Sequence, residues 1–526
     1  MANTTTHHSQ LNATFTGTTV DYTGTKINKF KGIKYAHIPA RFERAQPITP
    51  EQLSGKTIDA TQYGPKCPQV DVDVRHLLRI PEDFEIKDEV EDEFECLNLD
   101  VTVPADVPSG QKLPVLVWIY AKAHSVVRRL SSSHVLLCCI WYLWRKFMCS
   151  VDTTRIVADS VKAGKPIIMV AMNYRLNLFG FGDGKGTAEV NLSLKDQALA
   201  IDWVRQYIEG FGGDSENITL CGESAGAVYA HAHLITGPPV KRAILMSGSL
   251  HLSPPMPHQL GKGILEICEA RAQELEGKSL RECSQQVFKQ ILAENNLSRC
   301  WMQEEDVLAN WETKQEQVEE LMIGETEFES VIWRRGIETL SPSDIISTFT
   351  ASNAELGNKL RKAYHISADR PTSSTLGVLD LLHDSKFALP TELVAEKLIA
   401  NKKKVYRYLF DEVNPWQASS RAHHAVDILF LFGTMDYSHN PSAEAVGEDM
   451  RGRWVSFVSG SEPWSELSAT GKKFAFGPYG DCKEIDQKQF AGRRRSHILE
   501  LLREVGPQVY NGIANKLAAG KISLLN

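Results

Sequence analysis

Residues 217–227 read Asn-Ile-Thr-Leu-Cys-Gly-Glu-Ser-Ala-Gly-Ala, and the fold can be interpreted outward from this stretch. An apolar, β-favouring run leads into Gly-Glu-Ser-Ala-Gly, and small residues follow. This order predicts a strand, a sharp turn and a helix that together expose the hydroxyl of Ser224 as a nucleophile. Such a turn is crowded, and Gly222 and Gly226 leave room for it. Because glycine and serine are common, the pattern alone is weak, but its strand and helix context favours a reactive serine over an ordinary turn.

The composition is that of an ordinary soluble protein. The chain has 526 residues, of which 42% are apolar and 23% charged, and a net charge of −7. Nothing in this balance indicates nucleic acid or an anionic membrane as a partner. Residues 1–15 have neither a basic start nor an apolar core, so we expect no signal peptide and a cytoplasmic protein. The longest apolar run, 135–144, is too short to cross a bilayer, so we expect no transmembrane segment. The oligomeric state stays open.

Ten cysteines do not make a disulfide scaffold, and no CxxC pair suggests zinc. Cys67 could pair with Cys96, and Cys268 with Cys283. In the cytosol we expect these thiols to be reduced and buried instead.

Apolar runs and helical patterns alternate along the chain. Residues 97–103, 114–120, 166–173, 242–246, 320–324 and 404–410 read as strands, and 153–163 and 194–211 as helices. Several of the strands are apolar on both faces, which is typical of a buried parallel sheet. We therefore expect an α/β fold with a large, mostly parallel sheet flanked by helices. With no linker in sight, residues 1–526 read as one domain, with residues 1–25 flexible and helical excursions at 261–319 and 341–403.

A serine nucleophile needs a base and an acid, and where the serine lies in a strand–turn–helix of this kind they follow it in the chain in the order acid, then histidine. The strand at 320–324 ends beside three carboxylates, Glu325, Glu327 and Glu329. The strand at 404–410 is followed by His423 and His424. Loops at the carboxyl ends of strands face a common crevice, so these are the candidates, and spacing alone leaves the choice among them open.

From about residue 30 to residue 464 the chain resembles the type-B carboxylesterases, the cholinesterase-like branch of the α/β-hydrolases, and it looks most like the fungal, lipase-like forms. The motifs that carry the resemblance occur in order at 32–36, 95–99, 113–120, 173–175, 179–181, 195–197, 203–204, 211–214 and 222–226. It implies an α/β-hydrolase fold whose helical excursions lie over the site, and hydrolysis of small-molecule carboxylic esters with no cofactor or metal.

The resemblance also assigns the residues. It implies Ser224 as nucleophile, Glu329 as acid and His424 as base, with His423 only a neighbour. His424 would take the proton of Ser224, Glu329 would stabilise the imidazolium, and an acyl-enzyme would form and be hydrolysed. Asp427 and Glu223 read as buried hydrogen-bonding residues rather than as catalysts.

The chain departs from the family at the oxyanion hole. One oxyanion donor, the N–H of Ala225, is present. The other donors should come from a Gly-Gly-Gly or Gly-Gly-Ala loop after Tyr120, where this chain has Ala121, Lys122 and Ala123. Ala123 fits one family variant, but Lys122 stands where a glycine lets the backbone approach the substrate.

Residues 121–150 as a whole are anomalous, since the family pattern resumes only near residue 154. Three interpretations are open: a translated intron or frame error in the gene model, which we favour, a real insertion that remodels or covers the site, or true loss of the oxyanion hole. The sequence therefore predicts a carboxylic-ester hydrolase and, as the alternative, an esterase-like binding module with impaired catalysis. It does not identify the acyl or alcohol group.

Overall fold

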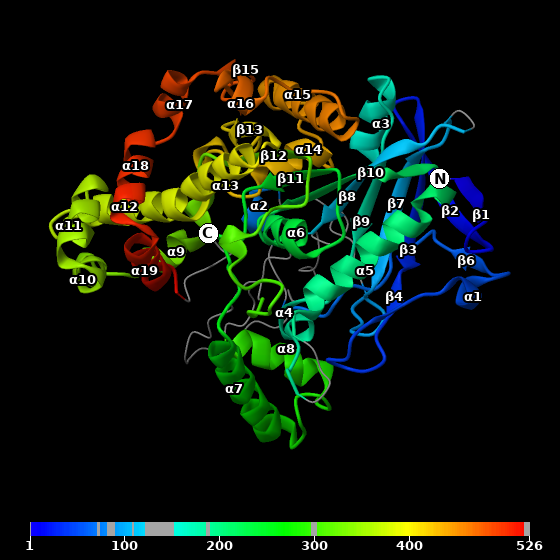
Figure 1. Cartoon of the computed structure of the whole chain (residues 1–526), viewed down its shortest axis with the longest axis horizontal. Helices are drawn as coiled ribbons and strands as arrows, with labels where there is room; N and C mark the ends of the chain where they lie inside the picture. The colour runs from blue at the N-terminus through cyan, green and yellow to red at the C-terminus, as the bar shows by residue number, and fades with distance from the viewer. Residues whose placement is uncertain are drawn as a thin grey trace, which may run out of the picture.

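The apolar runs in the middle of the chain form the parallel centre of one large sheet (Figure 1). The computed structural model describes residues 2–70, 74–81, 90–107, 110–120, 152–185, 190–295 and 302–519. Neighbouring strands run parallel in the order β9-β8-β10-β11-β12-β13-β14. Their bounds are β8 (Leu113–Ile119), β9 (Ile168–Met172), β10 (Gly213–Glu223), β11 (Arg242–Met246), β12 (Glu320–Thr326), β13 (Lys404–Phe410) and β14 (Lys473–Phe476). The predicted mostly parallel sheet is confirmed.

Antiparallel strands extend the sheet at both edges. At one edge lie β1 (Ala2–His8), β2 (Ala13–Tyr22), β3 (Thr25–Lys34) and β7 (Asn98–Pro104), and at the other β15 (Cys482–Ile485). The short β6 (Thr57–Asp59) runs parallel to β2, and β4 (Ala36–His37) pairs with β5 (Gln46–Pro47).

The expectation that residues 1–25 are flexible is wrong, because residues 2–22 are almost entirely strand. β1 pairs with β2 along its whole length. Ala13 and Phe15 alternate with half-buried threonines and are buried, which is the period of a strand that covers a core on one face. At the end of β1, the His8 ring is buried, and its Nε2 lies 2.7 Å from the carbonyl oxygen of Tyr207.

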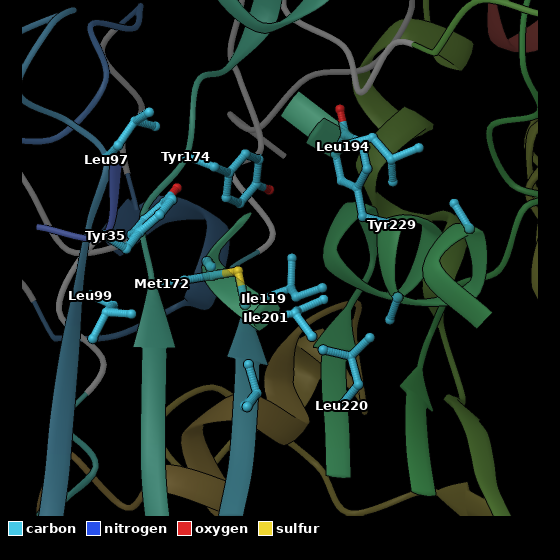
Figure 2. Close-up of a cluster of buried hydrophobic side chains, with 14 of the residues drawn as sticks. Tyr35, Leu97, Leu99, Ile119, Met172, Tyr174, Leu194, Ile201, Leu220 and Tyr229 are labelled. Carbon is cyan, nitrogen blue, oxygen red and sulfur yellow. The ribbon is translucent and has the colours of Figure 1, made fainter. Parts of the chain in front are cut away.

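Each face of the sheet carries its own hydrophobic core. Along β8, Val115, Val117 and Ile119 face one core, whereas Leu116 and Trp118 face the other. This is the alternation expected of a strand buried on both faces. Figure 2 shows the first core, where Ile119, Leu220 and Met172 of the sheet meet Ile201 and Tyr229 of the helices.

Helices cover both faces. On one side α5 (Leu192–Tyr207), which runs on into the short η1 (Ile208–Phe211), and α6 (Ala225–Thr236) pack against β10. On the other, α3 (Thr154–Lys162), α14 (Val426–Phe432) and α15 (Pro441–Val458) pack together. Smaller helices are α1 (Pro50–Leu53), α2 (Val74–Leu78), α4 (Asn177–Phe181), α9 (Arg334–Ile337) and α16 (Leu467–Thr470).

Two helical excursions leave this centre, and the last helix of the second, residues 389–400, returns to pack against β12 and β13 (Figure 1). The first contains α7 (His258–Glu276) and α8 (Gln285–Glu294). The second contains α10 (Pro342–Ser352), α11 (Ala354–Ala363), α12 (Pro371–His383), the π-helical η4 (Asp384–Ala388) and α13 (Leu389–Ala400). After β15 the chain continues through α17 (Gln487–Arg493) to α18 (Ser496–Val505) and α19 (Pro507–Ala518), and α18 and α19 pack on the second excursion.

The side chains of Cys67, Cys96, Cys268 and Cys283 are buried, and none of the four is in a disulfide. Within the described ranges, no helix is both long and apolar enough to cross a membrane. The apolar run at 135–144 lies outside these ranges.

Candidate active site

Ser224 lies in the sharp turn between the end of β10 and the start of α6. Its backbone has φ of +52° and ψ of −118°, which is a strained conformation for a residue with a side chain. The turn is as crowded as the sequence predicts: a Cβ added to Gly222 would lie 2.3 Å from the carbonyl carbon of Gly226. A Cβ on Gly248 would meet the Ser224 carbonyl oxygen at 2.4 Å, so a second glycine, which the sequence analysis did not single out, also makes room here.

The loop after β12 and the loop after β13 are hydrogen-bonded to each other through their backbones near Ser224. Phe328 and His423 form a β-bridge. The N–H of Phe328 donates to Ala422 at 2.9 Å, and the N–H of His424 donates to the Phe328 carbonyl oxygen at 3.2 Å. These backbone bonds fix the acid-bearing and histidine-bearing loops as one unit at the carboxyl ends of the strands, where ligands bind in open α/β sheets.

Ser224, His424 and Glu329 form a continuous chain of hydrogen bonds. The Nε2 of His424 lies 2.8 Å from the Oγ of Ser224, and its Nδ1 makes a short contact with Oε2 of Glu329. With the proton on Nδ1 directed at the carboxylate, Nε2 is left to accept the serine proton. His424 and Glu329 are buried, so the contacts act in a medium of low dielectric constant.

Of the three carboxylates at the end of β12 and directly after it, Glu329 is the one that contacts His424. Glu325 is buried in ion pairs with Arg407 and Arg494, at 2.5 and 3.0 Å. Glu327 pairs with Arg421 near the surface. Successive residues leave a strand end in different directions, which is why their spacing in the sequence could not separate them.

His423 is held in a different way from its neighbour. Its Nδ1–H donates to the His424 carbonyl oxygen at 2.9 Å, and its Nε2 accepts from Asn414 at 3.0 Å. Burial lowers the pKa of His423 to about 4, so its ring is neutral at ordinary pH. Both ring nitrogens are used in structural hydrogen bonds, and His423 is therefore not available to Ser224.

Two further carboxyl groups, those of Glu223 and Asp427, are buried beside His424. Oε1 of Glu223 lies 3.3 Å from Nε2 of His424. Burial raises the pKa of both carboxyl groups, and the charge of Glu329 raises both further, while the charge of Asp427 adds to the rise at Glu223. Burial alone would lower the pKa of His424, but the charges of Glu223 and Glu329 outweigh it and raise that pKa. The expected burial of Glu223 and Asp427 is confirmed, but the expectation that both are hydrogen-bonded is wrong: within the described residues, both carboxylate oxygens of Asp427 and Oε1 of Glu223 are buried without a hydrogen-bond partner. The two groups act on His424 through their charge.

One predicted oxyanion donor lies within the described residues. Ala225 is the first residue of α6, so its N–H has no acceptor inside the helix and is free to point at a developing negative charge. Lys122 and Ala123, the other two candidates, lie outside the described residues, as does the whole anomalous segment 121–150.

Three residues that the sequence analysis did not select also contact this site. The N–H of Thr326 donates to Oε1 of Glu329 at 2.6 Å, and the N–H of Glu329 donates to Nδ1 of His383 at 3.3 Å. The ring of Phe387 packs edge-to-face against the His424 ring, with 5.5 Å between centroids. His383 and Phe387 lie more than 50 residues from Glu329 in sequence, and no local pattern marks them.

Among the described residues, no group of three His, Cys, Asp or Glu side chains is arranged to hold a metal ion. The arrangement described above can instead move a proton from a serine hydroxyl to a histidine beside a buried carboxylate.

Comparison with known proteins gives the same family as the motifs. Lipase 3 of Yarrowia lipolytica is 29% identical over 476 residues, which is 86% of this chain and 88% of that protein. The para-nitrobenzyl esterase of Bacillus subtilis is 27% identical over 84% of this chain and 88% of its own length. The inactive carboxylesterase-like protein VdtD of Byssochlamys spectabilis is 34% identical, over 45% of this chain and 37% of its own length. The pattern of the Carboxylesterase family matches residues 4–484, and the chain therefore belongs to that family.

Proposed function

We propose that this protein is a serine carboxylic-ester hydrolase in which Ser224, His424 and Glu329 are the catalytic triad. Membership of the carboxylesterase family supports ester hydrolysis as the reaction. The observation that carries the triad is the hydrogen-bonded chain from Ser224 Oγ through His424 to Glu329, with Ser224 in a strained turn.

The reaction runs in two halves. His424 takes the proton of Ser224 as Oγ attacks the ester carbonyl carbon, and Glu329 stabilises the imidazolium that forms. The protonated His424 then gives its proton to the leaving alcohol, and an acyl-serine remains. In the second half His424 takes a proton from water, which attacks the acyl-serine and releases the acid. The N–H of Ala225 donates to the oxyanion in both halves.

Covalent labelling tests this proposal. A fluorophosphonate probe reacts with a serine only if a neighbouring base activates it. We expect the wild-type protein to be labelled at Ser224, and the Ser224→Ala variant not to be labelled. Ser330→Ala is the matched control, because that serine is also buried but lies outside the hydrogen-bonded chain. Equal labelling of wild type and Ser224→Ala would refute the enzyme proposal.

A second candidate is an esterase-like binding module without turnover. The replacement of glycine by Lys122 in the oxyanion loop favours it, and one relative is named as inactive. On this proposal the folded protein binds esters, yet no acyl-serine accumulates or turns over. Mass spectrometry after mixing with an activated ester decides between the two, because a mass increase on the peptide containing Ser224 excludes the binding module.

The transcript gives an independent check on the same question. A spliced message that restores two glycines after Tyr120 would remove the observation within this chain, Lys122 in the oxyanion loop, that favours the binding module. A message that encodes residues 121–150 as they stand would keep that alternative.

A further inference from the structure

A π-helical turn interrupts the second helical excursion beside the proposed triad. η4 (Asp384–Ala388) joins α12 to α13, and all five of its residues are buried. Such turns are rare in proteins, and those that occur are often found at functional sites. The ring of Phe387, in this turn, packs against the ring of His424. His383, the last residue of α12 and the one directly before the turn, contacts the acid. The turn and the residue directly before it therefore contact both loops that carry the proposed acid and base.

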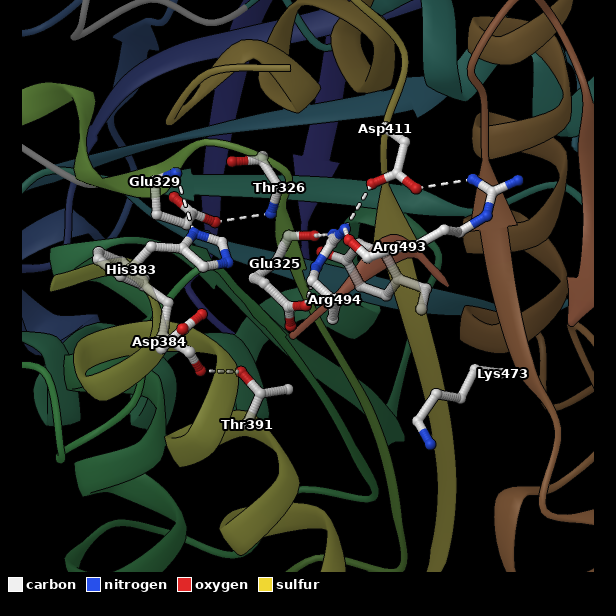
Figure 3. Close-up of polar contacts among 12 residues, drawn as sticks. Glu325, Thr326, Glu329, His383, Asp384, Thr391, Asp411, Lys473, Arg493 and Arg494 are labelled. Atoms are coloured by element: carbon white, nitrogen blue, oxygen red, sulfur yellow. Dashed lines mark hydrogen bonds and ion pairs between the residues drawn. The ribbon is translucent and has the colours of Figure 1, made fainter. Parts of the chain in front are cut away.

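His383 holds the backbone of the acid. Glu329 begins the short helix η3 (Glu329–Trp333), so its N–H has no acceptor within that helix. Nδ1 of the buried His383 accepts this N–H at 3.3 Å (Figure 3). Burial, with the charges of Arg495 and Arg494, keeps the pKa of His383 well below its usual value. The ring is therefore neutral and can accept a hydrogen bond.

The C-terminal helices hold the π-turn. Arg495 makes two parallel hydrogen bonds to the carboxylate of Asp384, each of 2.8 Å. Nζ of Lys386 donates to Asn515 of α19 at 2.5 Å. Both charged side chains of the turn are thus bound by the segment after residue 486, which lies beyond the family match at 4–484.

The same segment also holds the strand end that precedes the acid. Arg494 pairs with Glu325 at 3.0 Å and with Asp411 at 2.9 Å, as Figure 3 shows. Thr326, the next residue after Glu325, fixes Oε1 of Glu329. With Oε1 held by Thr326 and the backbone held by His383, Oε2 is directed at His424.

We propose that His383 is a positioning residue for Glu329, and that Arg495 acts through Asp384 to fix the π-turn that begins directly after His383. This inference rests on the proposed function, because it assigns Glu329 its role. Its physical basis is that a misplacement of about 1 Å in a catalytic group can lower the rate up to about a hundredfold.

The first test is a pair of substitutions at His383. His383→Phe fills the same space without an acceptor, whereas His383→Asn places an amide oxygen close to the position of Nδ1. We expect kcat for a p-nitrophenyl ester to fall about tenfold in the Phe variant with little change in KM, and the Asn variant to recover most of it. A wild-type kcat in the Phe variant, or equal losses in both variants, would overturn the proposal.

The pH profile separates positioning from a purely structural role. A Glu329 that is less well aligned raises the pKa of His424 less, so the acid limb of kcat/KM should move to lower pH in His383→Phe. A variant that is only less stable keeps the wild-type limb when it is assayed well below its melting temperature. An unshifted limb counts against positioning.

The second test compares two arginines of the same C-terminal segment. Arg495→Gln should lower kcat, and Arg495→Lys should lower it less. Arg503→Gln is the control, since Arg503 pairs with Glu396 of α13 at 2.6 Å, away from the π-turn, and should leave kcat unchanged. Equal kcat in Arg495→Gln and Arg503→Gln would refute the role of Arg495. If Arg495→Gln does not fold, the His383 pair decides.

Failure of the proposed function can be told apart from failure of this inference. If wild type is not labelled at Ser224, the enzyme proposal fails, and positioning is then read from the downfield proton resonance of the His424 Nδ1–H that is bonded to Glu329. A resonance that moves in His383→Phe but not in Arg503→Gln supports positioning of Glu329 even without turnover. A resonance that moves in neither variant overturns it.

Discussion

Two buried carboxyl groups, those of Glu223 and Asp427, lie beside His424 and influence its pKa. Glu223 and Asp427 are both fully enclosed, and both lie close enough to Glu329 for their charges to interact with it. Three carboxylates cannot all be ionised in such a space without a large cost, so Glu223 and Asp427 tend to bind protons to higher pH than usual. As each one ionises, it favours the protonated form of His424.

Replacing Glu223 by glutamine should therefore change the pH dependence of activity. His424 must be unprotonated to act as base, so activity is lost as the pH falls through its pKa. The charge of Glu223 raises that pKa. In Glu223→Gln we expect the acid limb of the kcat/KM profile to move to lower pH, measured on a p-nitrophenyl ester. Glu327→Gln is the control, because that carboxyl pairs with Arg421 near the surface. A limb that moves upward, or not at all, contradicts this assignment.

Among the elements, the N-terminal hairpin has a buried histidine, His8, at the end of its first strand. The His8 ring lies edge-on to Phe15, Tyr207 and Phe211, with centroids 5.5–6.2 Å away. Its Nδ1 accepts the N–H of Leu11 at 3.2 Å. Side chains alternate along a strand, so the preceding His7 points to the exposed side of β1.

His8→Ala should destabilise the protein, and His7→Ala should not. Loss of a buried ring with its hydrogen bonds is expected to cost about 3 kcal/mol of unfolding free energy, measured by denaturant titration. Burial lowers the pKa of His8 below its model-peptide value of 6.5. Stability from a neutral buried histidine is fully present above that value and is lost as the pH falls below it, so the difference between the variants should shrink in acid. Equal stability of the two variants at neutral pH would show that β1 is not anchored through His8.

At the scale of the whole molecule, a buried ion network joins the sheet to the C-terminal helices. Arg407 and Glu325 come from neighbouring strands and are wholly buried, while Arg494 reaches them from the C-terminal segment. Asp411 closes the network by binding Arg494 and Arg493. Every charge in this set has an opposite partner, which is the condition for burying it at all.

Removing one arginine of this ion network should lower the free energy of unfolding. Arg494→Met leaves Glu325 and Asp411 with one arginine each, and we expect unfolding free energy to fall by about 3–5 kcal/mol. Lys359→Met is the comparison, because its pair with Glu504 has both side chains more than half exposed and should contribute less than about 1 kcal/mol. Thermal unfolding of the two variants measures the difference. Similar losses in both would mean that the buried network is not what binds the C-terminal segment.

Features that depend on neighbouring residues could be predicted from the sequence, whereas features that depend on residues far apart in the chain could not. The strands at 242–246 and 404–410 were predicted to the residue because an apolar run between polar ends is a local signal. The hairpin at residues 2–22 was missed because a threonine-rich alternation reads as weakly apolar until its partner strand is known. Glu329 and His424 came from a family resemblance, since spacing alone did not separate them from Glu327 and His423.

The sequence by itself determined the alternation of strands and helices, the family, and the strained turn at Ser224, because each depends on residues that are neighbours in the chain. Only the tertiary structure shows that Glu329 contacts His424 while Glu325 and Glu327 do not. It also shows that His383 contacts the backbone of Glu329 and that Arg495 binds Asp384. Those contacts join residues that are tens to hundreds of positions apart. Their geometry is set by how the loops leave the sheet and how the C-terminal helices pack, and no local pattern encodes either.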